Sequence, residues 1–288
     1  MQDNEKYLFD LQGFIAVENA LSHEQLAELN RILDEHIAAE CELDMRTHRF
    51  GKLLDWGPAY RALIDNPAVA IYLEQIIDPQ FRLDHVYLDI IRSGTSPIGA
   101  SLHGGGAPFN PSQYYRFANG RMHNGLTVVA YNLADVGPED GGFGCVPGSH
   151  KTCYPTPPGI PSCDEDMGLV KHVEMKAGDV LFFGDGATTH GALAWKSEIS
   201  RRGILIKYSS RNFNRSGGEM VHPENRWGDL VEGMSDAQLV VMRGPDRDVF
   251  HHNVPRLEVD GGQVSVSYER GAALYSKAAP QGPVKKDS

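Results

Sequence analysis

The segment VKHVEMKAGDVLFFGDGATTHGA (residues 170–192) carries the clearest information on the fold. Two runs rich in β-branched and aromatic residues are joined at Lys176-Ala177-Gly178, which is the pattern of two strands and a turn. The second run leads to a lone histidine, His190, that stands beside a glycine. The segment therefore predicts paired strands, with an imidazole presented where the second strand-like run ends.

Other strand-like segments occur along most of the chain. Phe14 to Val17 alternates apolar residues near the start. Later segments of this kind are RLDHVYLDIIR (82–92), NGLTVVAYNLADV (124–136), GGFGCVPGSHK (141–151) and RRGILIKYSSR (201–211). Several short strands separated by turn residues favour a sandwich or a small barrel.

Helical patterns come before most of these strands. Ser22 and Gln25 have capping-box spacing at the start of residues 22–40, and apolar residues follow at helical intervals. A second helical pattern covers residues 59–77, with Pro67 at a break or at a new first turn. We expect one domain over residues 1–288, with N-terminal helices at roughly 20–78, a β core at roughly 82–215 and a C-terminal extension at 216–288 whose tail frays.

The charge of the chain argues against some classes of partner. A net charge of −11 disfavours nucleic acid and anionic membranes, because those surfaces attract clustered Lys and Arg, and a small-molecule substrate fits better. The start, MQDNEKYLFD, lacks a basic leader and an apolar core, and no run approaches a membrane span, so we expect a cytoplasmic protein. The four cysteines have irregular spacing without C-x-x-C, which predicts reduced thiols.

A second lone histidine stands in SLHGGGAPF (residues 101–109), before three glycines. Such a run can be the oxyanion-hole loop of a lipase-like hydrolase, but no serine of the chain lies in a G-x-S-x-G elbow. The alternative is that His103 is a metal ligand at a strand edge and that the glycines clear space around the metal.

His103 and His190 suit a metal held between facing sheet edges of a jelly-roll barrel. They are distant in the sequence, and each stands beside a glycine at the end of a strand-like run. Arg201 follows at the start of the last alternating segment, where a guanidinium could bind a carboxylate in bidentate fashion. Arg202 would point to the opposite face of that strand.

The segment DGGFGCVPGSHK (residues 140–151) resembles the hallmark of the phytanoyl-CoA dioxygenase family. The resemblance extends through GFIAVENALSHEQL, the strand that leads to His103, GDVLFFGDGATTHGA and SRRGILIKYS, and so covers roughly residues 10–215. It implies a mainly β (α+β) fold, a double-stranded β-helix or jelly roll with flanking N-terminal helices. It also implies an enzyme that uses iron(II), 2-oxoglutarate and dioxygen.

The resemblance assigns roles to particular residues. His103 corresponds to the first iron ligand and His190 to the last, while Arg201 corresponds to the residue that binds the distal carboxylate of 2-oxoglutarate. Gly203 stands where the family often has a serine hydroxyl, and Asn124 is a further candidate contact for the cofactor.

One position departs from the family pattern H-x-D, because Gly105 replaces the iron-binding aspartate. In one interpretation a chloride ion fills that position, as in related 2-oxoglutarate halogenases that have Ala or Gly there. In the other interpretation the glycines form a tight loop and another residue supplies the carboxylate. Asp185 is then the nearest candidate in the sequence, and Asp89 is possible.

The substrate region is less specific in sequence. Tyr114, Tyr115, Arg116 and Arg121 follow the iron motif, and they either line the mouth of the barrel or form a surface loop with aromatic packing. Trp56 either caps the pocket or packs in the core. His150 is expected to stabilise a turn, and His251-His252 lacks a partner at ligand spacing.

These observations predict an oxidoreductase that functionalises an unactivated C–H bond of a small molecule, by hydroxylation or by halogenation. The alternative is a non-catalytic jelly roll that binds a metal or a ligand, because a missing carboxylate and a missing serine are what such a relic would show.

Overall fold

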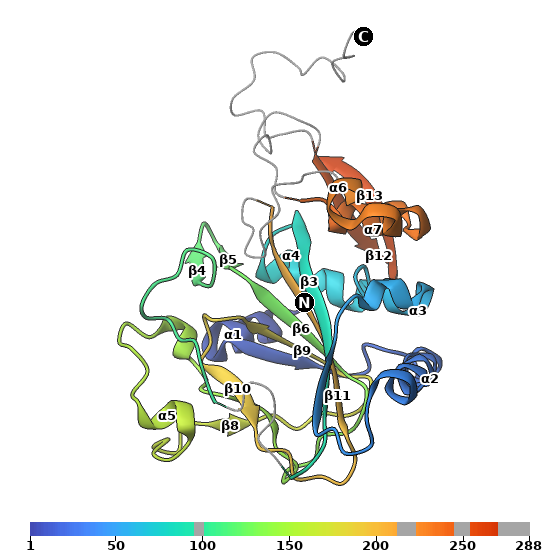
Figure 1. Cartoon of the computed structure of the whole chain (residues 1–288). Coiled ribbons are helices and arrows are strands. Elements are labelled where there is room, and N and C mark those ends of the chain that lie inside the picture. Colours follow the sequence, from blue (N-terminus) through green and yellow to red (C-terminus); the bar gives the residue numbers. More distant parts are fainter. Residues whose placement is uncertain (95–100, 212–222, 245–253, 270–288) are drawn as a thin grey trace.

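The centre of the molecule is an antiparallel six-stranded sheet (Figure 1) in a computed structural model that describes residues 1–94, 101–211, 223–244 and 254–269. In spatial order its strands are β1 (Phe14–Val17), β9 (Val180–Gly184), β6 (Thr127–Asn132), β11 (Arg201–Ser210), β3 (Phe81–Ile91) and β2 (Thr47–Phe50). Most neighbouring strands are distant in the sequence, as in a jelly roll. The predicted fold class is therefore confirmed.

A smaller sheet faces the first one. It consists of β10 (His190–Leu193), β7 (Gly142–Cys145) and β8 (Lys171–His172), in that order. The two sheets are held together by an apolar cluster, whose buried members are Phe14, Val128, Phe143, Cys145, Val173, Met175, Leu181 and Phe183. The cluster contains residues of both sheets, and their side chains pack together in the space between the sheets.

The other face of the large sheet is covered by helices. The helices are α2 (His23–Glu40), α3 (Pro58–Arg61) and α4 (Pro67–Ile76), and α1 (Asp3–Gln12) lies beside β1. On β11 the side chains of Ile204, Ile206 and Tyr208 are fully buried in this helical layer. Because side chains alternate along a strand, the intervening residues of β11 face the smaller sheet.

The local helix signals are confirmed. Ser22 caps α2 in a capping box. The backbone N–H of Gln25 donates to the Ser22 hydroxyl oxygen, and the backbone N–H of Ser22 donates to Gln25 Oε1 at 2.9 Å. Pro67 is the first residue of α4 after a cap by Asn66. The pattern over 59–77 is thus two helices, because Pro fits a first turn and interrupts an interior one.

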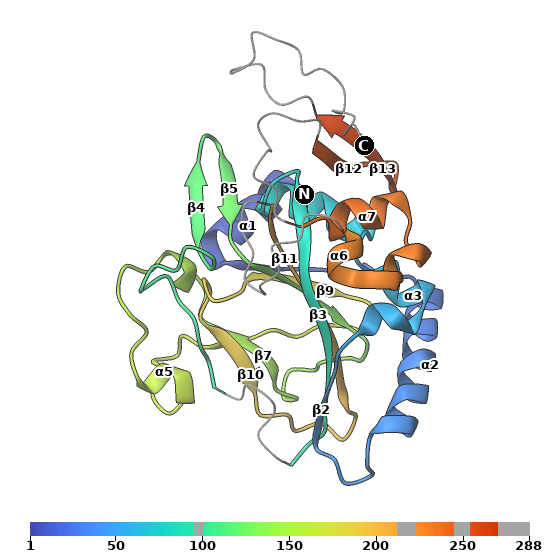
Figure 2. The same ribbon diagram turned by 45° about the horizontal axis from the view of Figure 1, so that its top comes forward.

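Several elements had no sequence signal. They are α1, β2, the hairpin of β4 (Tyr115–Ala118) and β5 (Arg121–Asn124), the C-terminal helices α6 (Pro223–Trp227) and α7 (Asp236–Met242), a hairpin of β12 (Val254–Asp260) and β13 (Gln263–Glu269), and the short helices η1 (Leu53–Trp56), η2 (Ser149–Lys151), α5 (Gly159–Ser162) and η3 (Gly228–Gly233). Figure 2 shows α7 beside β3 and the β12–β13 hairpin, and contacts join these elements. We propose on this basis that the described residues form one domain.

Two predictions concern other parts of the chain. The frayed tail and His251-His252 lie outside the described residues. In the four described ranges, no helix has the length and apolar character needed to cross a lipid bilayer.

His150 attaches helix α1 to the β core. Its Nε2 donates to the backbone carbonyl of Asp10 at 2.9 Å, and Lys151 forms an ion pair with the Asp10 carboxylate at 2.7 Å. The Tyr115 hydroxyl also hydrogen-bonds this carboxylate. Burial lowers the pKa of His150 to about 4, so the imidazole is neutral at pH 7.

This lowered pKa makes stability depend on pH. An unfolded histidine titrates near pH 6.5, so the unfolded chain binds more protons and stability falls as the pH drops from about 6.5 to 4. We expect the wild type to lose about 2 kcal/mol more unfolding free energy between pH 7 and pH 5 than His150→Gln. Urea denaturation at both pH values measures this difference, and equal losses in the two proteins would contradict it.

Candidate metal centre

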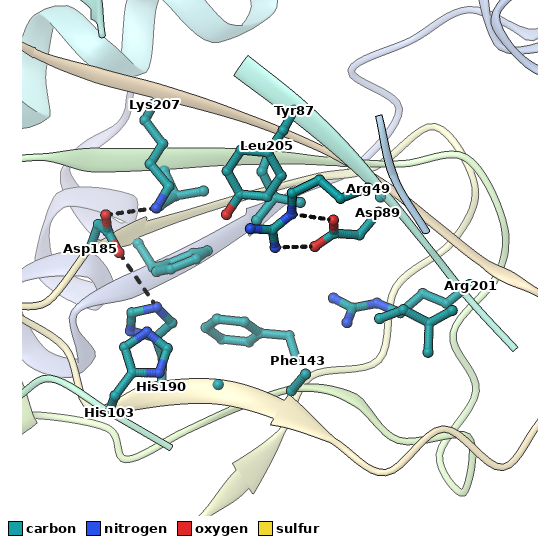
Figure 3. A pocket seen from close by; sticks show the side chains of 16 residues that line it. Arg49, Tyr87, Asp89, His103, Phe143, Asp185, His190, Arg201, Leu205 and Lys207 are labelled. Carbon is teal, nitrogen blue, oxygen red and sulfur yellow. Dashed lines mark hydrogen bonds and ion pairs between the residues drawn. The ribbon is translucent and has the colours of Figure 1, made fainter. Parts of the chain in front are cut away.

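Three side chains with metal-ligating atoms converge at one end of a cavity between the two sheets (Figure 3). These are His103, Asp185 and His190, and their ligand atoms all lie within 4.8 Å of one another. His190 begins β10, and Asp185 directly follows β9. His103 pairs with His190 through two backbone hydrogen bonds of 2.8 and 2.9 Å, so the backbone itself brings the two imidazoles together.

The His190 ring is oriented for a ligand. Its Nδ1 donates to the Thr188 carbonyl at 2.7 Å, which leaves Nε2 facing Asp185 Oδ1 at 3.7 Å. Burial lowers the pKa of His190 to about 4, so the ring is neutral near pH 7. A neutral imidazole with one nitrogen fixed by a carbonyl is the usual form of a metal-binding histidine.

Asp185 is buried, and its two oxygens face different partners. Oδ2 accepts a hydrogen bond from Lys207 Nζ at 2.8 Å, while Oδ1 faces His190. Lys207 lies on β11, six residues after Arg201 and on the same face of the strand. The lysine therefore holds the carboxylate with one oxygen directed at the histidines.

A side chain at the position of Gly105 would first meet residues outside this cluster. The φ of Gly105 is +131°, and a Cβ at this position would meet the hydroxyl oxygens of Thr156 at 2.9 Å and Thr189 at 3.1 Å. An aspartate here would thus be strained and would first meet two hydroxyls. The other sequence candidate, Asp89, is bound by Arg49 through both of its oxygens. Of the carboxylates considered from the sequence, Asp185 is the one beside the histidines.

Arg201 lies at the opposite end of the cavity (Figure 3). Its Nε is buried and has no hydrogen-bond partner among the residues that the structure describes. Burial lowers the pKa of this guanidinium, although an arginine remains charged at neutral pH. Its neighbour Arg202 points to the helical side, where it binds Asn30 and Asp34, as strand alternation predicts.

The remaining predicted residues lie in different places. Gly203 lines the cavity beside Arg201. Asn124 is buried and donates to Thr127 Oγ1 at 2.7 Å, and it is not among the lining residues.

The predicted substrate residues do not line the cavity either. Tyr114, Tyr115 and Arg116 line a separate hollow beside the β4–β5 hairpin, and Arg121 donates to the Glu74 carbonyl. The pairing of β4 with β5 separates this hairpin from the two main sheets. Their predicted place at the mouth is therefore not supported by their positions.

Trp56 stacks on His36 with ring centroids 3.8 Å apart and packs against the helical core. It therefore packs with the core instead of capping the cavity.

Three further charged or polar residues of the cavity were not predicted as site residues. Lys207 and Tyr87 could have been found from strand alternation. Lys207 is an even number of residues from Arg201 on the same strand, and Tyr87 is two residues from Asp89, so each faces the cavity with that neighbour. Arg49 had no such signal, because β2 is short and its residues do not alternate clearly.

Comparisons with known proteins give one family and one fold. A model of the phytanoyl-CoA dioxygenase (PhyH) family matches residues 9–203. No curated protein matches the sequence significantly.

Among solved structures, HygX from Streptomyces hygroscopicus with nickel and 2-oxoglutarate bound is 21% identical, with a TM-score of 0.66 over 74% of this chain and 89% of that one. The carbocyclase SnoK from nogalamycin biosynthesis is 17% identical, with a TM-score of 0.56 over 76% of this chain and 88% of its own. The epimerase SnoN from the same biosynthesis is 19% identical, with a TM-score of 0.54 over 75% of this chain and 87% of its own. At these identities the likeness shows a shared fold.

Replacing Lys207 by methionine keeps an apolar stem and removes the ammonium group that neutralises Asp185. Breaking a buried ion pair in this way is expected to cost the metal-free protein about 3 kcal/mol of unfolding free energy. Nickel should restore part of this loss in Lys207→Met, because the cation takes over the role of the lysine charge. Urea denaturation with a chelator and with nickel measures both effects.

The control is Lys176→Met, which removes an exposed lysine paired with Asp135 at 3.4 Å and should change stability by less than about 1 kcal/mol. If Lys207→Met is as stable as the wild type in the presence of chelator, the buried Asp185 carboxylate does not need the lysine charge.

Proposed function

The chain belongs to the phytanoyl-CoA dioxygenase family, and we propose that it is an iron(II)- and 2-oxoglutarate-dependent oxygenase that hydroxylates a small molecule. The observation that carries the proposal is the convergence of His103, Asp185 and His190 within 4.8 Å. Two imidazoles and one carboxylate are the donor set of non-haem iron(II) oxygenases. The residues present therefore fit this metal.

Two of the three candidate ligand residues, His190 and Asp185, are oriented by other contacts. His190 would bind through Nε2, because Nδ1 is already occupied by the Thr188 carbonyl. Asp185 would bind through Oδ1, since Lys207 occupies the other oxygen. When bound, iron(II) would supply the oxidising chemistry, with 2-oxoglutarate and dioxygen as co-substrates and with succinate and carbon dioxide as by-products.

Arg201 would bind the distal carboxylate of 2-oxoglutarate. The support for this role is a buried Nε without a partner among the described residues, at the end of the cavity opposite the histidines. A carboxylate there would satisfy the buried donor and the charge together. Phe143 and Leu205 line the cavity between the two ends and would exclude water from the reacting groups.

The arrangement favours hydroxylation over halogenation. Asp185 would complete three protein ligands, so a chloride ion is not needed to balance the charge of the metal. The halogenase interpretation depends on open space beside Gly105, and the Cβ direction at this glycine leads to Thr156 and Thr189.

A second candidate function is a non-catalytic jelly roll that binds an anion. The Lys207–Asp185 ion pair favours it, because the lysine already compensates the carboxylate without a metal. In that case Arg201 would still bind a carboxylate, but 2-oxoglutarate would not be consumed.

Succinate formation tests the enzyme class. Iron-loaded wild-type protein should convert 2-oxoglutarate to succinate, and His103→Ala and Asp185→Asn should reduce the rate by about 100-fold or more, because each removes a metal ligand. The exposed Asp135→Asn is the matched control. Absence of succinate in the wild type would favour the anion-binding jelly roll, and chloride-dependent turnover by Asp185→Asn would revive the halogenase interpretation.

The role of Arg201 is tested against its neighbour. Arg201→Gln should raise the KM for 2-oxoglutarate by about 100-fold, since it removes a partly buried charge from a carboxylate partner. Arg202→Gln should leave this KM within about twofold, because Arg202 binds helix α2 instead. Equal effects of the two substitutions would contradict the assignment.

A further inference from the structure

Two arginines flank one carboxylate in the cavity wall. In the antiparallel register, Asp89 of β3 stands opposite Arg49 of β2 on one side and opposite Gly203 of β11 on the other. Arg201 is two residues from Gly203 on the same face and is therefore a diagonal neighbour of Asp89. Diagonal neighbours in a sheet are about 7–8 Å apart, which is within reach of an arginine side chain. Both guanidinium groups can thus compete for this carboxylate.

Arg49 donates a hydrogen bond to each carboxylate oxygen of Asp89. Its Nε donates to Oδ1 and its Nη2 donates to Oδ2, both at 2.7 Å, which is the bidentate geometry of a strong arginine–carboxylate pair. The guanidinium also lies 4.1 Å from the centroid of the Tyr87 ring, and this contact fixes its plane. The buried Nε of Arg201 has no hydrogen-bond partner in the described part of the chain.

The residue of β11 directly opposite Asp89 is Gly203, which has no side chain. A Cβ at Gly203 would meet only Leu205 at 3.9 Å, so the position opposite Asp89 is open. The Asp89 side chain is only 12% exposed, so water cannot replace a lost cation fully. Without Arg49, the uncompensated carboxylate would attract Arg201 and would repel a dicarboxylate in the same cavity.

We infer that Arg49 is a positioning residue, which neutralises Asp89 and thereby keeps Arg201 available for the distal carboxylate of 2-oxoglutarate. The inference rests on the proposed function of Arg201. Arg49 acts through Asp89 and does not contact the co-substrate. Its contribution should therefore disappear when Asp89 loses its charge, whereas a direct contact would persist.

A double-mutant cycle tests this dependence. The four proteins are the wild type, Arg49→Gln, Asp89→Asn and the double variant, each loaded with redox-inert nickel and titrated calorimetrically with 2-oxoglutarate. Arg49→Gln should weaken binding by about tenfold or more, and Asp89→Asn should stay within about threefold of the wild type. The double variant should return to within about threefold of the wild type. Weak binding by the double variant would overturn the inference.

Nickel affinity, together with the wild-type titration, separates the possible failures. Nickel affinity should be the same in all four proteins, because the metal ligands lie at the other end of the cavity. If the wild type does not bind 2-oxoglutarate, both the proposed function and the inference are wrong. If the wild type binds and Arg49→Gln binds equally well, only the role of Arg49 is wrong.

Should Arg49→Gln fail to fold, Arg49→Lys replaces it in the cycle. Lysine keeps the charge but cannot donate to both oxygens in the arginine geometry, so binding should weaken and again recover with Asp89→Asn. If Arg49→Lys weakens 2-oxoglutarate binding and Asp89→Asn does not restore it, the inference is overturned here too.

Discussion

The alternation of β11 is the constraint on which the rest of the structure depends. This strand pairs with both β3 and β6 and forms the middle of the large sheet. Its apolar residues Ile204, Ile206 and Tyr208 are buried under the helices, so a shift of one residue would expose the core. The same alternation turns Arg201 and Lys207 to the opposite face. Packing on one face thus determines which charges enter the cavity on the other.

Apart from its histidines, the cavity contains more positive than negative side chains. Its lining includes three cations, Arg49, Lys207 and Arg201, and two carboxylates, Asp89 and Asp185. Each carboxylate has a cation within 2.8 Å, which offsets the cost of burying it. Arg201 is the cation that remains. The charges of a bound divalent metal and of a dicarboxylate would cancel. The net positive charge of the lining side chains would therefore remain and would favour binding of the anionic co-substrate in this cavity.

Local signals in the sequence were reliable where the determining contacts are themselves local. Ser22 and Pro67 mark helix starts because capping and the fixed φ of proline act within one turn. Helix α1 gave no such signal. Only Phe9 of this helix is buried, and the helix is attached by contacts of Asp10 with His150, Lys151 and Tyr115, which are distant in sequence. A sequence pattern cannot report contacts that form only after the sheets have assembled.

The candidate site divides in the same way. The sequence by itself indicated His103, His190 and Arg201, because each lies in a short motif that resembles a family motif with a known role. Strand alternation added only that Arg201 and Arg202 face opposite sides. The sequence left the third metal donor open between a chloride ion, Asp185 and Asp89. Only the tertiary structure shows that Asp185 lies beside the two histidines, while Asp89 is paired with Arg49 through the register of β2 with β3. The backbone at Gly105 has a positive φ, which a sequence pattern does not reveal. Register and loop direction are set by pairings between distant segments, and these pairings decide which carboxylate reaches the histidines.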